Sequence, residues 1–137
     1  MRKFVIATHG LMADGMKDSI AFISGIKDSI QAISFFTQDV DYSKVVADVF
    51  KDKKEEDEII IFTDIYYGSV CQQFMPYLRL PNVHMISGVN LPLILEIVMT
   101  TGELNADMLK GIIVNSREQL AYVDPLPLAS TTEDSIF

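Results

Sequence analysis

The sequence predicts a three-layer α/β/α domain whose mainly parallel sheet has the strand order 2-1-3-4. Apolar runs rich in β-branched residues alternate with segments whose apolar residues recur at helical spacing, which is typical of βαβ units. The run from Ile59 to Phe62 is unbroken, as expected for a strand buried on both faces of a parallel sheet. Since parallel crossovers are right-handed, a chain that winds outward from its first strand in both directions gives this order.

Each predicted strand is followed by a predicted helix. The strands are expected at residues 3–8, 30–36, 59–64 and 83–87, and the helices at residues 11–24, 42–50, 69–79, 91–101 and 105–119. The expected N-cap residues of the second, third and fourth helices are Asp39 or Asp41, Ser69, and Asn90. Ser69 is favoured because Gln72 follows it at the spacing of a capping box.

The charged segment and the C-terminal segment are expected to have less regular structure. Residues 51–58 are interpreted as a solvated helix end and loop. Residues 120–123 predict a short last strand. Residues 124–137 contain two prolines among Ser, Thr and Asp, which indicates an extended arm or a disordered tail. We therefore expect one domain over residues 1–123 and an arm over residues 124–137.

Composition narrows the classes of function. A chain of 137 residues suits one domain with a hydrophobic core. The net charge of −8 disfavours nucleic acid and acidic membrane surfaces as partners. No apolar stretch approaches the ~20 residues that a membrane span needs. The single cysteine, Cys71, excludes an internal disulfide and a multi-cysteine metal cluster, and the expected location is the cytoplasm.

Five residues at the ends of the first and third strands predict phosphoryl-group chemistry. His9 ends the first strand, and open α/β sheets bind their ligands at the carboxyl ends of strands. Asp64 ends the neighbouring third strand, where a carboxylate can fix the imidazole tautomer and leave the other nitrogen free to attack. Thr8 lies at the same crevice. The Ser69 hydroxyl, the Gly68 backbone and the free N–H groups at the start of the third helix offer donors for a phosphoryl group.

Simpler interpretations of the same residues stand beside this one. Ser69 is sufficiently explained as a helix cap, and Asp64 as a turn former. His84 lies inside a predicted strand and is interpreted as a packing residue. The histidines and acids lack metal-ligand spacing, so no metal site is predicted. Tyr66 and Tyr67 are candidates for core, a lid or a docking surface.

Four motifs occur in order at the strand ends. They are T-H-G after the first strand, L-M-A-D-G-M in the first helix, T-D-x-x-x-G-S after the third strand and G-V-N-L-P after the fourth. Together they resemble the EIIA domain of the mannose family of the bacterial phosphoenolpyruvate-dependent sugar phosphotransferase system. The resemblance covers about residues 3–101, and the rest of the chain is compatible with it.

The resemblance implies a specific role for the predicted site. His9 corresponds to the phosphorylated histidine, Asp64 to the residue that orients it, Ser69 to a phosphate contact and Thr8 to the threonine before the histidine. Such domains accept a phosphoryl group from HPr and pass it to an EIIB partner during sugar uptake. They are typically homodimers that exchange a C-terminal strand, and they need no metal or organic cofactor.

The chain departs from the family pattern after the third strand, which leaves other functions open. Tyr67 stands where a glycine is usual, and Val70 where a proline is usual. One alternative is a regulatory or binding module of the same fold with altered or lost transfer. A second is the phosphocarrier subunit of a dihydroxyacetone kinase, whose motif after the first strand is usually H-S. A third is a small hydrolase with His9 as base.

Overall fold

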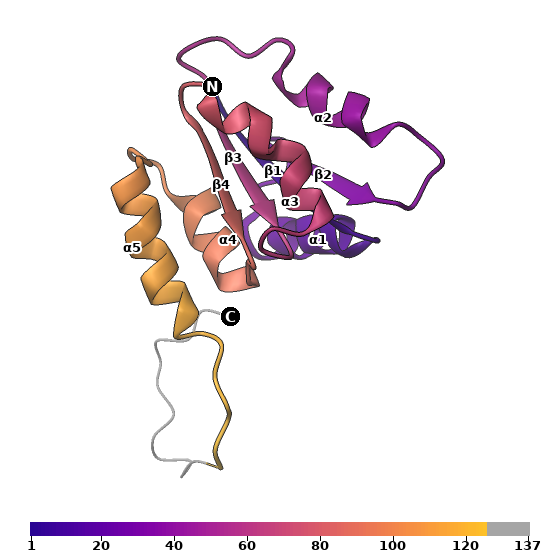
Figure 1. The fold of residues 1–137 in the computed structure, drawn as a ribbon. Helices are drawn as coiled ribbons and strands as arrows, with labels where there is room; N and C mark the ends of the chain where they lie inside the picture. Colours follow the sequence, from indigo (N-terminus) through magenta and orange to yellow (C-terminus); the bar gives the residue numbers. More distant parts are fainter. Residues whose placement is uncertain (126–137) are drawn as a thin grey trace.

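A four-stranded parallel sheet forms the middle layer of the protein (Figure 1). The computed structural model describes residues 1–125. Within them the strands are β1 (Arg2–His9), β2 (Ile30–Phe35), β3 (Glu58–Thr63) and β4 (Val83–Ser87). They lie in the order β2-β1-β3-β4, and each neighbouring pair is parallel. The predicted fold class and strand order are therefore confirmed.

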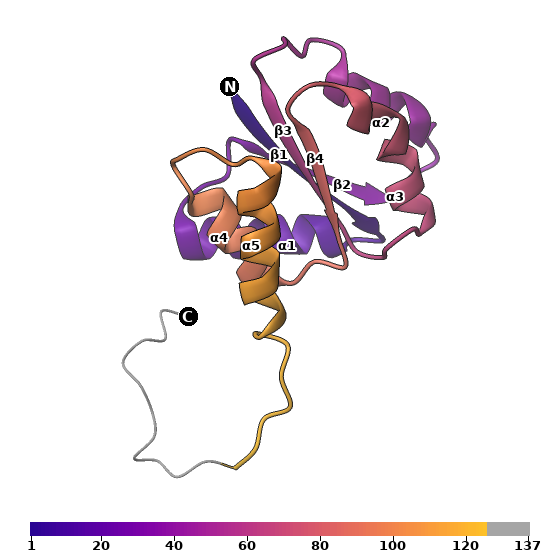
Figure 2. The same ribbon diagram turned by 60° about the vertical axis from the view of Figure 1, so that its left-hand side comes forward.

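Helices cover both faces of the sheet (Figures 1 and 2). One face packs against α1 (Met12–Ser24), α4 (Leu91–Met99) and α5 (Ala106–Arg117), and the other against α2 (Tyr42–Phe50) and α3 (Ser69–Phe74). Successive side chains of β1 point to opposite faces of the sheet. Phe4 and Ile6 pack in the hydrophobic core beneath α1, α4 and α5, and Val5 and Ala7 pack in the core beneath α2 and α3. Among the described residues, no helix is long and apolar enough to cross a membrane.

The strand register places the end of β1 at the carboxyl edge of the sheet. His9 pairs with Phe35 of β2, whereas the last residue of β1 paired with β3 is Ala7, opposite Thr63. β1 therefore continues two residues beyond its ladder with β3. His9 thus lies beside the turn that leaves β3.

Most helix boundaries follow the expected capping residues. Three side chains accept a hydrogen bond from a backbone N–H in the first helical turn: those of Asp41, Asn90 and Asn105. Gly25 ends α1 in the left-handed conformation, with a φ of 77°. The caps predicted for the second and fourth helices are therefore confirmed, with Asp41 and Asn90 as the capping residues.

The third helix is shorter than predicted. Instead of one helix over residues 69–79, α3 ends at Phe74 and a 3-10 helix, η1 (Met75–Arg79), follows. The N–H of Met75 bonds to the carbonyl of Gln72, three residues back. Pro76 has no N–H with which to continue α-helical bonding, so the tighter helix takes over at this point.

The predicted last strand does not form within the single chain. Residues 120–125 have no regular structure, and the side chains of Leu120, Tyr122 and Val123 are exposed. A strand exchanged with a second chain would leave these residues unpaired in one chain alone. Of the predicted arm, residues 126–137 lie outside the described residues.

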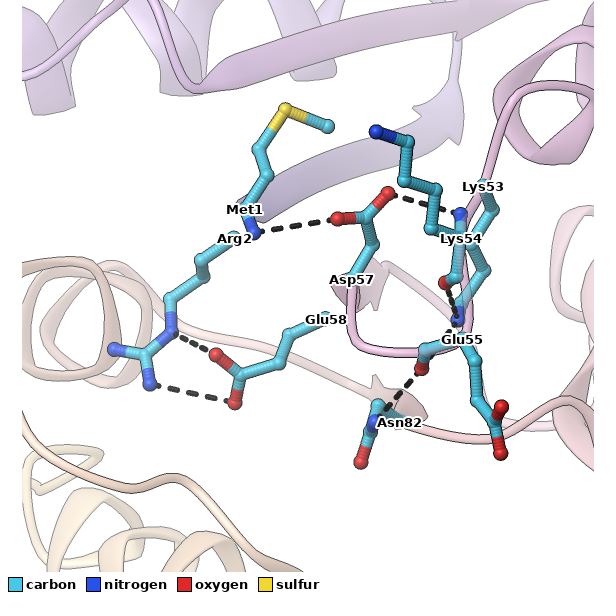
Figure 3. Close-up of polar contacts among 8 residues, drawn as sticks. All are labelled: Met1, Arg2, Lys53, Lys54, Glu55, Asp57, Glu58 and Asn82. Carbon is cyan, nitrogen blue, oxygen red and sulfur yellow. Dashed lines mark hydrogen bonds and ion pairs between the residues drawn. The ribbon is translucent and has the colours of Figure 1, made fainter.

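Polar contacts tie together the amino ends of β1 and β3 (Figure 3). The α-amino group of Met1 lies 3.2 Å from Asp57 Oδ1, and the other carboxylate oxygen of Asp57 accepts the backbone N–H of Lys54 at 2.9 Å. The Arg2 guanidinium contacts both carboxylate oxygens of Glu58, at 3.0 and 3.3 Å. It also donates to carbonyl oxygens in the connection between α4 and α5, those of Thr100 and Gly102.

This network corrects the end of the segment over residues 51–58, which the sequence predicts to be a solvated helix end and loop. Residues 51–56 are largely exposed as predicted, whereas Asp57 and Glu58 are not. Asp57 is only 7% exposed, and Glu58 is the first residue of β3. The N–H of Lys54 is the largest cause of a lowered pKa at Asp57; burial opposes it, and the nearby α-amino group adds to it. Asp57 and Glu58, at the end of the charged segment, therefore help to hold the sheet together at its amino end.

Candidate functional site

His9 and Asp64 form a direct pair at the carboxyl edge of the sheet. The Nδ1 atom of His9 lies 2.9 Å from Asp64 Oδ2, and the same oxygen accepts the backbone N–H of His9 at 2.9 Å. Asp64 Oδ1 accepts the N–H of Ile65 at 3.0 Å. Since a carboxylate only accepts hydrogen bonds, these contacts assign the ring proton to Nδ1 and leave Nε2 with its lone pair.

The environment of Asp64 keeps it ionised. Partial burial alone would raise its pKa, because burial penalises the charged form. Hydrogen bonds from the backbone N–H and the ring of His9 outweigh that effect and lower the pKa of Asp64 below its usual range. The carboxylate is thus a fixed acceptor for the His9 ring at neutral pH.

Ser69 faces the other nitrogen of the imidazole. Its hydroxyl oxygen lies 3.0 Å from His9 Nε2, on the exposed side of the ring. Ser69 is the first residue of α3 and Gly68 is the N-cap, so the prediction that Ser69 caps this helix is wrong. The Gln72 side chain donates to the carbonyl of Tyr67 rather than completing a capping box. The serine hydroxyl is consequently available to the histidine.

Gly68 permits the tight turn between β3 and α3. A Cβ atom at this position would lie 3.1 Å from Cβ of Ile65 and 3.2 Å from its carbonyl oxygen. The same carbonyl accepts the N–H of Gly68 at 3.0 Å. A side chain at this position would force Ile65 to shift by a few tenths of an ångström, so Gly68 lets the turn pack closely just before Ser69.

Thr8 is buried beneath the site rather than facing the open crevice. Its hydroxyl oxygen accepts the N–H of Ala13 at 2.7 Å, and the residue has no exposed surface. Leu11, the N-cap residue of α1, makes no side-chain cap. Thr8 therefore satisfies a backbone donor at the start of α1, and its hydroxyl also donates to the carbonyl oxygen of Gly10 at 3.5 Å.

Two aromatic residues flank His9 in left-handed backbone conformations. Tyr67 has a φ of 57°, so it takes the type of conformation for which glycine is favoured. Phe36 has a φ of 66°, and its ring centroid lies 5.7 Å from that of His9. The sequence predicts that Phe36 belongs to the second strand, but the positive φ of Phe36 ends β2 at Phe35. No local sequence signal marks this contact, because it depends on the strand register that pairs Phe35 with His9.

Comparisons with known proteins agree with this arrangement. Residues 3–114 match a family model, EIIA-man, described as the PTS system fructose IIA component. The chain is 31% identical to a Klebsiella pneumoniae protein described as a phosphoenolpyruvate-dependent sugar phosphotransferase system permease, with a TM-score of 0.81 over 88% of this chain and 90% of that one. A comparison with curated proteins found no significant match.

More distant solved structures share the fold. The mannose/sorbose-specific IIA subunit from Enterococcus faecalis has a TM-score of 0.75 at 19% identity, over 93% of this chain and 98% of that one. A PTS IIA protein associated with the fucose utilization operon of Streptococcus pneumoniae has a TM-score of 0.75 at 22% identity, over 88% and 92%. Since the family model spans most of the sequence, the chain belongs to the EIIA-man family and is an IIA-type component of a sugar phosphotransferase system.

Proposed function

We propose that His9 is the phosphoryl-accepting nucleophile of a cytoplasmic phosphocarrier. In this role the protein takes a phosphoryl group from the phosphohistidine of HPr and passes it to an EIIB partner. The observation that carries the proposal is the His9 imidazole, held at Nδ1 by Asp64 while Nε2 points to the exposed side. Family membership supports it independently.

The hydrogen bonds around the ring define the transfer step. The Nε2 lone pair of His9 attacks phosphorus, and the Nε2–P bond forms as the P–N bond to the donor imidazole breaks. The proton on Nδ1 stays where it is, because Asp64 accepts it throughout. The Ser69 hydroxyl, which contacts Nε2 in the free protein, turns to donate to a phosphoryl oxygen. The second transfer runs the same step in reverse toward EIIB.

The surface around His9 suits a protein partner better than a small molecule. His9 is 39% exposed at its side chain, and large apolar or aromatic side chains on the adjoining turns are exposed too: Leu11, Ile65, Tyr66 and Tyr67. Aromatic residues are enriched where protein interfaces gain most of their binding energy. A phosphoryl group on the exposed nitrogen is accessible to a second histidine or other acceptor carried by a partner.

We also propose a homodimer in which residues 120–123 exchange between protomers. The exposed apolar side chains of this segment support the proposal, because a terminal segment can be swapped at low cost. Sedimentation at micromolar concentration measures the state directly. A dimer is expected, and a monomer would contradict the exchange.

The decisive experiment is phosphorylation from purified components. The protein is incubated with phosphoenolpyruvate, enzyme I and HPr, and its intact mass is measured before and after acid treatment. One acid-labile phosphate is expected on the wild type and on His84→Gln, the matched control at the other histidine. None is expected on His9→Ala. An unlabelled wild type, or equal labelling of His9→Ala, would reject the carrier and favour a regulatory module of the same fold.

A further inference from the structure

The ring of Phe36, the first residue after β2, lies beside the His9 ring. The planes of the two rings meet at 46°, with centroids 5.7 Å apart. Phe36 reaches this position because Phe35 pairs with His9 in the β1–β2 register. Asp64 and Ser69 contact the edge of the imidazole, through its two nitrogens. Phe36 adds an aromatic neighbour to these two polar contacts.

The backbone of Phe36 adopts a conformation that is unfavourable for its residue type. A φ of 66° is uncommon outside glycine and is an outlier for a bulky side chain. Such conformations persist only where surrounding structure holds them, and they cluster at functional sites. Because 61% of Phe36 is exposed, burial in the core does not account for this conformation.

Tyr42, in the first turn of α2, holds the Phe36 turn in place. Its hydroxyl accepts the backbone N–H groups of Thr37 and Gln38, each at 3.1 Å, and donates to the carbonyl of Ser34 at 3.4 Å. The ring of Tyr42 meets that of Phe36 edge to face, with centroids 5.7 Å apart. The turn is thereby fixed from both sides of Phe36, and the phenyl ring remains against His9.

We propose that Phe36 is a positioning residue for the phosphohistidine. It keeps the imidazole in the orientation that points Nε2 outward, and it excludes water from one side of the phosphorylated ring. Loss of the phosphoryl group to solvent requires water to attack phosphorus as the Nε2–P bond breaks. A phenyl ring beside the imidazole removes part of the space from which that water approaches. The proposal rests on the proposed function of His9 as the phosphorylated residue.

The test separates the aromatic contact from the fold and from the partner proteins. The wild type is phosphorylated with phosphoramidate, a small-molecule donor, alongside Phe36→Leu, Phe36→Tyr and Phe22→Leu. Leucine keeps a branched apolar side chain but lacks a ring, and tyrosine keeps the ring. Phe22 is 91% exposed on α1, so its substitution is the matched surface control. The half-life of the phosphohistidine is followed by phosphorus NMR, and the His9 ring protons by proton NMR before phosphorylation.

Phe36→Leu is expected to abolish the ring-current shift of the His9 protons and to shorten the phosphohistidine half-life roughly two- to tenfold, the range expected for one aromatic contact. Phe36→Tyr and Phe22→Leu are expected to match the wild type in both measurements. An unchanged half-life in Phe36→Leu, or a tyrosine variant that behaves like the leucine variant, would overturn the proposal. Labelling of His9 by phosphoramidate but not by phospho-HPr would reject the carrier function alone.

Discussion

The two ends of the sheet are built from different kinds of interaction. At the amino end, Met1 and Arg2 bind Asp57 and Glu58 (Figure 3). Arg2 also donates a hydrogen bond to the connection between α4 and α5. At the carboxyl end, the His9 side chain is partly exposed. Two of the three non-glycine residues with positive φ in residues 1–125, Phe36 and Tyr67, lie there.

This difference separates stability from function within one sheet. The contacts at the amino end join segments distant in sequence, such as Arg2 and Glu58, and they hold the layers together. The carboxyl end instead retains strained backbone and exposed aromatic side chains, which reduce stability and are typical of functional sites. Substitutions at the two ends should therefore affect different measurements, and four predictions test this.

The largest expected effect is on the rate of phosphoryl transfer, at the carboxyl end of the sheet. Asp64→Asn keeps the side-chain shape but removes the carboxylate that holds the ring proton on Nδ1. The rate of phosphorylation by phospho-HPr is expected to fall by about 100-fold or more, because the tautomer and orientation of His9 are no longer fixed. Rapid-quench labelling measures the rate. Asp57→Asn, at the opposite end, is the matched control and should transfer at the wild-type rate.

The second-largest expected effect is on the stability of the protein, at the amino end of the sheet. Arg2→Met keeps the aliphatic stem but loses the ion pair with Glu58 and the bonds to two carbonyl oxygens. The free energy of unfolding is expected to fall by about 1.5–3 kcal/mol, the range for hydrogen bonds to charged groups. Urea denaturation measures it. Transfer by the folded variant should be unchanged, and a large loss of transfer would show that the two ends are coupled.

The contribution of Asp57 should depend on pH. Its pKa is lowered from the usual 3.8, so folding favours its ionised form. Its stabilising effect is complete above about pH 4 and is lost as the pH falls through the lower pKa of the folded state. Asp57→Asn is therefore expected to reduce the urea midpoint at pH 7, and the difference from the wild type is expected to disappear as the pH falls through the lowered pKa of Asp57 in the folded state. Asp52→Asn, an exposed neighbour, should show no difference at either pH.

The smallest effect is the relief of strain beside the site. Tyr67→Gly removes the penalty of a left-handed tyrosine, partly offset by the greater freedom of glycine in the unfolded chain, for a net stabilisation of ~0.5–1 kcal/mol. Thermal unfolding measures it. Tyr66→Gly, at the neighbouring position without a positive φ, is expected to destabilise the protein instead. A destabilised Tyr67→Gly variant would mean that the tyrosine ring contributes more than its backbone costs.

Local patterns predicted the residues of the site but misassigned some of their contacts. His9 and Asp64 were identifiable because each ends an apolar run, and strand order then made them neighbours. The capping-box spacing at Ser69 was misleading, since the hydroxyl bonds to a ring 60 residues away in the chain. Thr8 stays a predicted phosphate contact, and in this structure its hydroxyl bonds to the N–H of Ala13 and the carbonyl oxygen of Gly10. Capping patterns involve residues that are close in sequence. They cannot predict a contact with a residue that is distant in sequence and that only folding brings near.

The sequence by itself determined the α/β architecture, the strand order and the position of His9 and Asp64 at the ends of neighbouring strands. These follow from hydrophobic periodicity and from the right-handed crossover, which act along the chain. Tertiary structure alone decided that Ser69 faces Nε2, that Phe36 lies beside the imidazole and that Asp57 joins the amino-terminal network. These contacts depend on the register between strands and on the paths of turns, because side chains far apart in sequence meet only when the sheet has formed.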